Sequence, residues 1–379
     1  MTLQSHPAQR LPGLDLLRAC AIALVLMSHY AGFVSHAPTF GFIGEAGWSG
    51  VDLFFVLSGY LIGNQLLAPL ARGEAWSLKV FFARRLLRTL PNYYAVLAVY
   101  LLLPHSPIAG REMGPTWQFL SFTQNIGMEY GQTFTHSWSL CIEEQFYLVL
   151  PLAVLALAWG GVRPRLAWAV LASAFGFGIA MRVAAWLQDG HDAFAAEVYY
   201  SSLCRFGELL PGVAIAMLKN FHPTTFARLL RHANALFAAG LALSAAALYC
   251  VVEHVLPPFP RAALGFPLVA LAFGLLVCAA LAPHCILNRI RVPGAASLAL
   301  WSYAVYLVHK PVFMALRPQL ERLGVDAGAP TTIVAVMALG VAGGWLLYRL
   351  VELPFMRLRE RWAPARPAPE TIRSRPASA

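Results

Sequence analysis

Apolar stretches long enough to cross a lipid bilayer recur along the whole 379-residue chain. A helix needs about 20 mostly apolar residues to span the hydrocarbon core. Only 12 % of the residues are charged, roughly half of what soluble domains carry. We therefore predict an all-α polytopic membrane protein with about ten transmembrane helices. The predicted spans cover residues 14–33, 49–70, 90–104, 138–158, 166–187, 203–218, 234–252, 264–281, 297–316 and 330–351.

Basic residues gather in alternate loops between these spans, which predicts an orientation. The loops after the second, fourth, sixth and eighth spans are rich in arginine and lysine, whereas acidic residues outnumber basic ones in the opposite loops. Because cytoplasmic loops are enriched in Lys and Arg, both termini are expected in the cytoplasm. The net charge of +10 has the same origin, and no basic–aromatic patch indicates binding to nucleic acid.

The chain divides into three predicted segments: a cytoplasmic N-terminal segment (1–12), one transmembrane domain (13–357) and a basic, Pro- and Ala-rich cytoplasmic tail (358–379). The composition of the tail predicts disorder. Asp15 and Arg18 interrupt the first apolar run, which is therefore unlike a cleavable signal peptide. The six cysteines show no CxxC spacing, and they predict neither a disulfide framework nor a metal site.

The first predicted span contains two ionisable side chains, Arg18 and His29. Eleven residues make close to three helical turns, so the two side chains share one face about 16 Å apart. Ionisable groups inside membrane helices usually face the protein interior and mark functional sites. In the alternative interpretation Arg18 only reaches the cytoplasmic surface and His29 lies in the outer interface.

Acidic residues occur inside other predicted spans as well. Asp52 opens the second span at a depth similar to that of His29, and a carboxylate beside an imidazole would orient the ring and raise its basicity. Alternatively, Asp52 caps the start of its helix. Arg205 and Glu208, three residues apart at the start of the sixth span, predict an ion pair that could be structural.

The fourth span opens with His136 and Trp138, followed by Glu143 and Glu144. His136 and Trp138 could simply anchor the helix in the membrane interface. Two adjacent glutamates inside a membrane helix predict a functional role or a buried charge network. They point about 100° apart, so one can face the substrate while the other pairs with an intramembrane arginine such as Arg18, Arg182 or Arg205.

Two further groups of polar residues flank or enter later spans. Arg85 and Arg88 precede the third span and share a helical face, so together they could hold two phosphates. Clusters of this kind on the cytoplasmic side also contact lipid headgroups without further function. Tyr303, Tyr306 and Lys310 lie on one side of the ninth span.

Six motifs, in order along the chain, resemble those of the acyltransferase-3 family of integral membrane acyltransferases. They are Arg18-x10-His29, Gly50-Val51-Asp52-Leu53-Phe54-Phe55-Val56-Leu57-Ser58-Gly59, Arg85-x-x-Arg88, His136-x-Trp138-Ser139-Leu140-x-x-Glu143-Glu144-Gln145-Phe146-Tyr147, Ser302-Tyr303…Tyr306-Leu307…His309 and Glu352-x-Pro354-Phe355. The resemblance runs from about Leu14 to Phe355. Some relatives also carry an SGNH hydrolase-like domain, which this sequence lacks, so a stand-alone form is expected.

The resemblance implies a multi-pass enzyme of a bacterial cytoplasmic membrane that transfers an acyl group from cytoplasmic acyl-CoA. Acetyl is the expected acyl group, and no metal is expected. The expected acceptor is a sugar hydroxyl on a cell-surface or lipid-linked glycan, such as an O-antigen or exopolysaccharide. The expected catalytic residues are His29, Arg18, Asp52, Glu143 and Glu144. The residues expected to bind the donor are Arg85, Arg88 and Tyr303. Those expected to bind the acceptor are His136, Trp138, Ser58 and Tyr60.

Three alternatives stay open from the sequence. His29 either deprotonates the acceptor hydroxyl or carries the acyl group briefly as a relay. The acceptor is either a glycan or a small molecule such as a secondary metabolite. A glycan or solute transporter would also need intramembrane ionisable groups, but the sequence shows no evident internal repeats of the kind common in transporters. Dependence on acyl-CoA separates an acyltransferase from a transporter.

Overall fold

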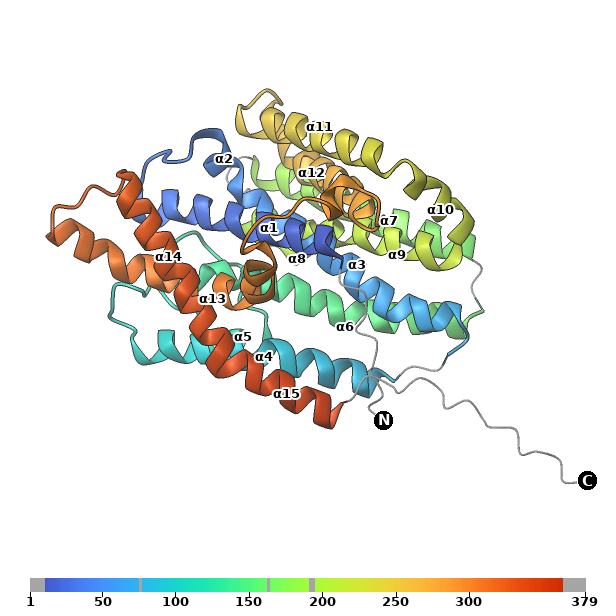
Figure 1. Ribbon diagram of the computed structural model, residues 1–379, viewed down its shortest axis with the longest axis horizontal. Helices are drawn as coiled ribbons and strands as arrows, with labels where there is room; N and C mark the ends of the chain where they lie inside the picture. The colour runs from blue at the N-terminus through green and yellow to red at the C-terminus, as the bar shows by residue number, and fades with distance from the viewer. Residues whose placement is uncertain (1–10, 75–76, 162–163, 191–194, 364–379) are drawn as a thin grey trace, which may run out of the picture.

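The computed structural model describes residues 11–74, 77–161, 164–190 and 195–363. Over these residues the regular structure is helical, which confirms the predicted all-α class (Figure 1). The α-helices are α1 (Pro12–Tyr30), α2 (Gly41–Glu45), α3 (Ser49–Ala71), α4 (Leu78–Leu102), α5 (Thr116–Ser121), α6 (Trp138–Trp159), α7 (Pro164–Asp189), α8 (Ser202–Arg205), α9 (Leu210–Phe221), α10 (Pro223–Arg231), α11 (Ala233–Val252), α12 (Pro258–Ala280), α13 (Ala295–Arg322), α14 (Pro330–Leu347) and α15 (Leu353–Trp362).

Each predicted span coincides with one or two of these helices. Within the described part of the chain, seven helical segments are long and apolar enough to cross a membrane, so the protein is a multi-pass membrane protein. Three predicted spans are not among the seven. They correspond to α4 and α13, which contain several basic side chains, and to the short pair α8–α9, which a 3-10 turn at Phe206–Leu209 separates.

Two predicted boundaries are wrong. The third span is predicted to begin at residue 90, but α4 begins at Leu78, where the side chain of Ser77 accepts a hydrogen bond from the helix start. Basic side chains hide this first part of α4 from a prediction based on apolar length. The disordered tail is predicted to begin at residue 358, but α15 continues through Trp362. The remaining tail, 364–379, and most of the N-terminal segment lie outside the described residues.

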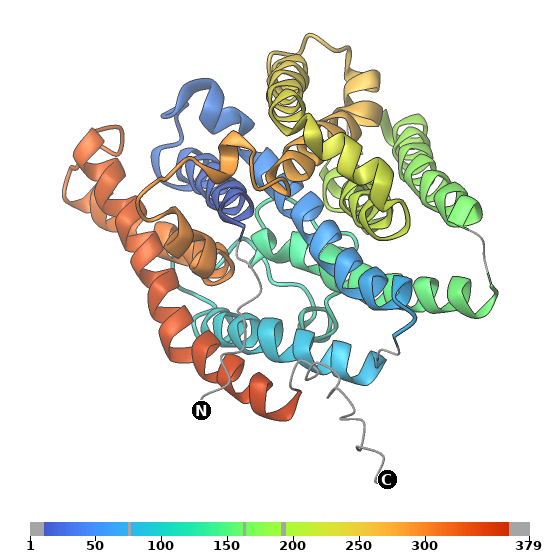
Figure 2. The ribbon, with the colours of Figure 1, turned by 45° about the vertical axis from the view of Figure 1, so that its right-hand side comes forward.

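The helices form one bundle around α1 and α3. Helix α1 packs against α3 and α13, while α3 also packs against α6, α9 and α12. Figures 1 and 2 show α10 and α11 on one flank, with α14 and α15 on the opposite flank. Because α1 lies near the centre of the bundle, we use its two ends to name the two ends of the bundle. We call the end near Arg18 the arginine end and the end near His29 the histidine end.

Two glycines let α3 and α9 approach each other closely. A Cβ atom on Gly59 would lie 1.9 Å from the carbonyl oxygen of Leu209. On Gly212 it would lie 2.1 Å from the carbonyl oxygen of Val56. Small residues at such crossings are common between membrane helices, because packing rather than the hydrophobic effect drives their association. This crossing fixes the position of α3, which contributes to the site described below.

We expect Gly59→Ala to destabilise the protein, because the added methyl group collides with backbone atoms. Forcing extra atoms into a packed interior costs about 1–3 kcal/mol. Thermal denaturation of the purified protein in detergent measures the effect. Gly176→Ala in α7 is the matched control, because a Cβ atom there has no neighbour within 4 Å. Equal denaturation temperatures for Gly59→Ala and the wild type would contradict the tight crossing.

Candidate active site

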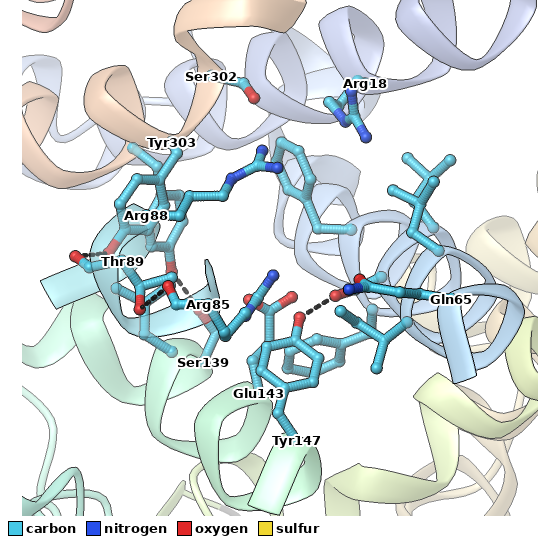
Figure 3. A pocket seen from close by; sticks show the side chains of 18 of the residues that line it. Arg18, Gln65, Arg85, Arg88, Thr89, Ser139, Glu143, Tyr147, Ser302 and Tyr303 are labelled. Carbon is cyan, nitrogen blue, oxygen red and sulfur yellow. Dashed lines mark hydrogen bonds between the residues drawn. The ribbon is translucent and has the colours of Figure 1, made fainter. Parts of the chain in front are cut away.

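A cavity of about 410 Å³ opens at the arginine end of the bundle, between α1, α3, α4, α6, α13 and α15. Figure 3 shows the side chains of α1 and α4 that converge on it. The described residues that line it include five arginines and one carboxylate, that of Glu143, so positive charge dominates. Converging guanidinium groups suit phosphates, which they can bind by paired hydrogen bonds. We call this space the arginine cavity, after Arg18, Arg84, Arg85, Arg88 and Arg359.

Helix α4 delivers two of these arginines to the cavity. Arg85 Nε lies 3.5 Å from Glu144 Oε1 on α6, and the Arg85 guanidinium lies 3.7 Å from the centroid of the Tyr147 ring. Arg88, one turn further along α4, points into the cavity (Figure 3). Glu144 of α6 does pair with an arginine, but its partner is Arg85, which the sequence places on the cytoplasmic side before the third span. The suggested partners are wrong, because the apolar pattern does not identify the first turns of α4 as helix.

Helix α15 contributes one side chain to the lining of the cavity. Arg84 donates a hydrogen bond to the carbonyl oxygen of Ala363, and its second nitrogen lies 3.3 Å from Glu360 Oε1. These contacts hold α15 against α4, and α15 carries Arg359 into the lining of the cavity. The sequence does not single out Arg359, because the composition of residues 358–379 predicts a disordered tail.

Two tyrosines of α13 form the inner wall. Tyr303 donates a hydrogen bond of 2.8 Å to the carbonyl oxygen of Thr89, which ties α13 to α4. Tyr306 donates to the carbonyl oxygen of His136 at 2.5 Å, so its oxygen accepts from Ser139 Oγ at 2.7 Å. Tyr306 thus lines the arginine cavity on one side and contacts a group of histidines on the other.

Three histidines come together on the side of Tyr306 that faces away from the arginine cavity. We call His29, His136 and His309 the histidine cluster. His29 Nδ1 lies 2.6 Å from His309 Nε2, and the two rings are nearly parallel, with centroids 4.9 Å apart and an interplanar angle of 15°. The centroid of the His136 ring lies 5.6 Å from that of His309. His136 Nε2 donates to the carbonyl oxygen of Leu307 at 3.0 Å. The cluster joins α1, α13 and the turn before α6.

A buried lysine lies next to the histidine cluster. Lys310 is 3 % exposed and follows His309 on α13. Its ammonium group donates a hydrogen bond to Thr135 Oγ1 and lies 4.7 Å from the centroid of the Phe33 ring. A cation held in a mostly apolar site can stabilise a negative charge that develops nearby.

The structure places eight of the twelve predicted site residues in two groups, pairs Glu144 with Arg85 of the arginine cavity, and leaves three residues apart. The arginine cavity brings together Arg18, Arg85, Arg88, Glu143, Ser58 and Tyr303, and the histidine cluster contains His29 and His136. Tyr60 lies apart from both groups, where its hydroxyl accepts a hydrogen bond of 3.0 Å from Lys219. Trp138 packs against Phe55 and Tyr199. The Arg205 guanidinium lies 5.3 Å from the centroid of the Trp138 ring.

Asp52 is the third residue that lies apart, and the prediction that it orients His29 is wrong. Arg205 Nη2 donates to Asp52 Oδ1 at 2.9 Å, and Arg205 Nε lies 3.3 Å from Glu208 Oε2, which confirms the predicted Arg205–Glu208 pair. Arg182 lies 3.0 Å from the other oxygen of Glu208. All four side chains are 0 % exposed. Asp52 belongs to this ion network, and His29 bonds to His309 instead.

The sequence patterns assign no role to His309 and Lys310. Tyr306 and His309 are three residues apart and therefore share a helical face, which is a usable signal. The pairing of His309 with His29 joins residues 280 positions apart, which no local spacing reveals. Among the described residues, no three His, Cys, Asp or Glu side chains are arranged to hold a metal ion.

Comparisons with known proteins agree with the motifs. A family model described as an acyltransferase domain, Acyl_transf_3, matches residues 11–349. The peptidoglycan O-acetyltransferase OatA of Listeria monocytogenes is 28 % identical over 332 residues, which cover 82 % of this chain and 50 % of that protein. The putative peptidoglycan O-acetyltransferase YrhL of Bacillus subtilis is 28 % identical over 330 residues, with the same shares.

A third relative covers a shorter stretch. The O-acetyltransferase OatA of Staphylococcus aureus is 35 % identical over 162 residues, which cover 38 % of this chain and 24 % of that protein. The chain thus spans about half the length of the Listeria and Bacillus relatives. No solved structure matches the chain.

Proposed function

The chain belongs to the acyltransferase-3 family, and on this basis we propose that it transfers an acyl group from acyl-CoA to a hydroxyl group of a cell-surface glycan. The relatives are named as O-acetyltransferases, which supports acetyl as the acyl group. Two of them are named for peptidoglycan, which supports a glycan of the cell envelope as the acceptor. We place the protein in the cytoplasmic membrane of a bacterium with both termini in the cytoplasm.

The observation that carries this proposal is that the arginine cavity and the histidine cluster lie on the two sides of Tyr306. Acyl-CoA has phosphates at one end and a thioester at the end of a long flexible arm. We assign the phosphates to the arginine cavity, where guanidinium groups converge from α1, α4 and α15. The arm would then lead towards Tyr306 and the histidine cluster. No metal takes part in the proposed reaction.

In the proposed reaction, His29 takes the proton from the acceptor hydroxyl while the hydroxyl oxygen attacks the thioester carbonyl. The tetrahedral intermediate carries a negative oxygen, which Lys310 is placed to stabilise. Its collapse breaks the carbon–sulfur bond, and the CoA thiolate takes the proton from His29. The products are the ester and CoA with a free thiol. If His29 carries the acyl group first, its nitrogen attacks the thioester and the carbon–sulfur bond breaks. The hydroxyl oxygen then attacks the acyl-imidazole, the carbon–nitrogen bond breaks to free His29, and the hydroxyl proton ends on the CoA thiolate.

We expect the double variant Arg85→Gln/Arg88→Gln to weaken the binding of acetyl-CoA by at least about 10-fold. A hydrogen bond to a charged group contributes about 1.5–3 kcal/mol, and the variant removes several of them. Binding of radiolabelled acetyl-CoA to the purified protein in detergent measures the dissociation constant. Arg72→Gln, an exposed arginine at the end of α3, is the matched control. Unchanged affinity in the double variant would contradict the donor site.

Two other functions make different predictions for the same protein. A transporter would move its substrate across the membrane without forming an ester and without consuming acetyl-CoA. An acyltransferase with a small-molecule acceptor would consume acetyl-CoA but leave the cell-surface glycans unchanged. Release of CoA in membrane vesicles and analysis of the glycans therefore separate the three functions.

A further inference from the structure

A chain of two hydrogen bonds runs from the backbone of α13 to His29. His309 Nδ1 lies 2.9 Å from the carbonyl oxygen of Val305, one turn earlier on the same helix. The other ring nitrogen of His309, Nε2, lies 2.6 Å from Nδ1 of His29 on α1. The first distance is typical of a hydrogen bond with an N–H donor, and the second is a short one.

The chemistry of the groups fixes the direction of this chain. A carbonyl oxygen only accepts, so the proton of His309 must be on Nδ1. In a neutral imidazole one nitrogen donates and the other accepts, so His309 Nε2 is an acceptor. His29 Nδ1 must then donate to it. It follows that Nε2 of neutral His29 carries no proton and holds a lone pair.

We propose that His309 is a positioning residue: it fixes the tautomer of His29 so that Nε2 of His29 is the atom that takes the proton of the acceptor hydroxyl or carries the acyl group. The inference rests on the proposed function, which gives His29 its role as base or relay. It assigns the reacting atom of His29 and gives His309 a task that neither the sequence nor the comparisons assign.

Packing holds the His309 ring in this orientation. His309 is 0 % exposed. Its ring lies nearly parallel to that of His29, at an interplanar angle of 15°, and meets the ring of Phe313 in a T-shaped contact with the centroids 5.7 Å apart. The centroid of the Tyr306 ring lies 5.9 Å from that of His309, on the side of the arginine cavity. A side chain enclosed in this way keeps its rotamer, as a group that orients a catalytic residue must.

The surroundings of His29 leave its reacting nitrogen available. His29 is half-buried, whereas His309 and His136 are buried. Over the described part of the chain, the hydrogen bond of His29 uses Nδ1 and leaves Nε2 free. His136 is held in the other tautomer, because its Nε2 donates to Leu307. Its remaining nitrogen, Nδ1, is buried and lacks a partner among the described residues, so it is less accessible than Nε2 of His29.

His309 can also stabilise the positive charge that His29 acquires during the reaction. When Nε2 takes the proton of the hydroxyl, the ring becomes an imidazolium and its Nδ1–H becomes a stronger donor. His309 Nε2 accepts that hydrogen bond and so stabilises the charged ring, as the third group of a catalytic triad does. The proton then leaves from His29 Nε2 to the CoA thiolate, and the tautomer is restored.

A matched pair of variants at position 309 tests the proposal. Glutamine has an amide oxygen that can accept the hydrogen bond from His29 Nδ1, and methionine has the same length without a strong acceptor. We expect His309→Met to lower kcat for acetyl transfer about 10- to 100-fold, by analogy with the loss of a group that orients a metal-ligating histidine. His309→Gln should keep a kcat at least about 5-fold higher than that of His309→Met. The KM for acetyl-CoA should stay unchanged in both variants, because the arginine cavity is intact.

Nitrogen-15 NMR of the purified protein labelled at histidine measures the tautomer directly. His29 is identified by the signals that disappear in His29→Gln. We expect a protonated Nδ1 and an unprotonated Nε2 in the wild type. A protonated Nε2 in wild-type His29 would overturn the proposal, as would a normal kcat in His309→Met. Because the NMR measurement needs no substrate, it remains decisive if His309→Met does not fold or if the acceptor differs from the proposed one.

Discussion

Replacing His29 with glutamine is expected to abolish acyl transfer and to leave the protein folded. A positioned general base accelerates a reaction by about 10²- to 10⁴-fold, and the loss of a covalent relay would be complete. Glutamine still offers an amide N–H to His309 Nε2, so the contact between α1 and α13 can survive. Acetyl transfer from acetyl-CoA in membrane vesicles measures the loss.

His105→Gln is the control for this variant, because His105 is an exposed histidine outside both groups of site residues. It should transfer acetyl at the wild-type rate. Binding of acetyl-CoA should stay unchanged in His29→Gln, which would show that the donor site remains folded. Transfer by His29→Gln within about 2-fold of the wild type would rule out His29 as base or relay, because losing a base costs far more.

Replacing Arg205 with glutamine is expected to destabilise the protein more than any other change considered for the ion network. Arg205 bridges Asp52 and Glu208, and all three side chains are fully buried. Its guanidinium also lies 3.6 Å from the centroid of the Phe266 ring. Removing one partner of a buried ion pair leaves an uncompensated charge, which costs about 3–5 kcal/mol. Thermal denaturation of the purified protein should show the loss.

Two further variants make this test specific. Arg317→Gln removes an arginine from an exposed ion pair with Glu321 and should change the denaturation temperature little. The double variant Arg205→Met/Asp52→Asn removes the stranded charge together with its partner, so it should recover part of the stability. Wild-type stability in Arg205→Gln would show that the network does not stabilise the fold.

Local patterns are sufficient to predict much of the bundle and part of the site. The eleven-residue separation of Arg18 and His29 places two ionisable groups at two depths on one helix. Arg205 and Glu208 are predicted to pair from their i,i+3 spacing, which a helix brings together without help from the rest of the fold. Apolar length locates most of the helices, because a bilayer imposes a minimum span.

Pairings between distant helices cannot be predicted in this way. Asp52 is expected beside His29 because both are placed at one depth, yet Asp52 pairs with Arg205 and His29 with His309. Two residues at the same membrane depth can lie on different sides of the bundle. The packing of α3 against α9 and of α1 against α13 decides which side chains become neighbours. Apolar length also fails for α4 and α15, whose basic side chains face the arginine cavity.

The most direct test of the proposed function is the acyl content of the cell-surface glycans, measured by mass spectrometry and proton NMR. The strains to compare are the wild type, a strain lacking the protein, and that strain supplied with either the wild-type protein or His29→Gln. The account predicts an acetyl ester that disappears on deletion, returns with the wild-type protein and does not return with His29→Gln. Glycans with the same acyl content in all strains would contradict a cell-surface glycan as the acceptor.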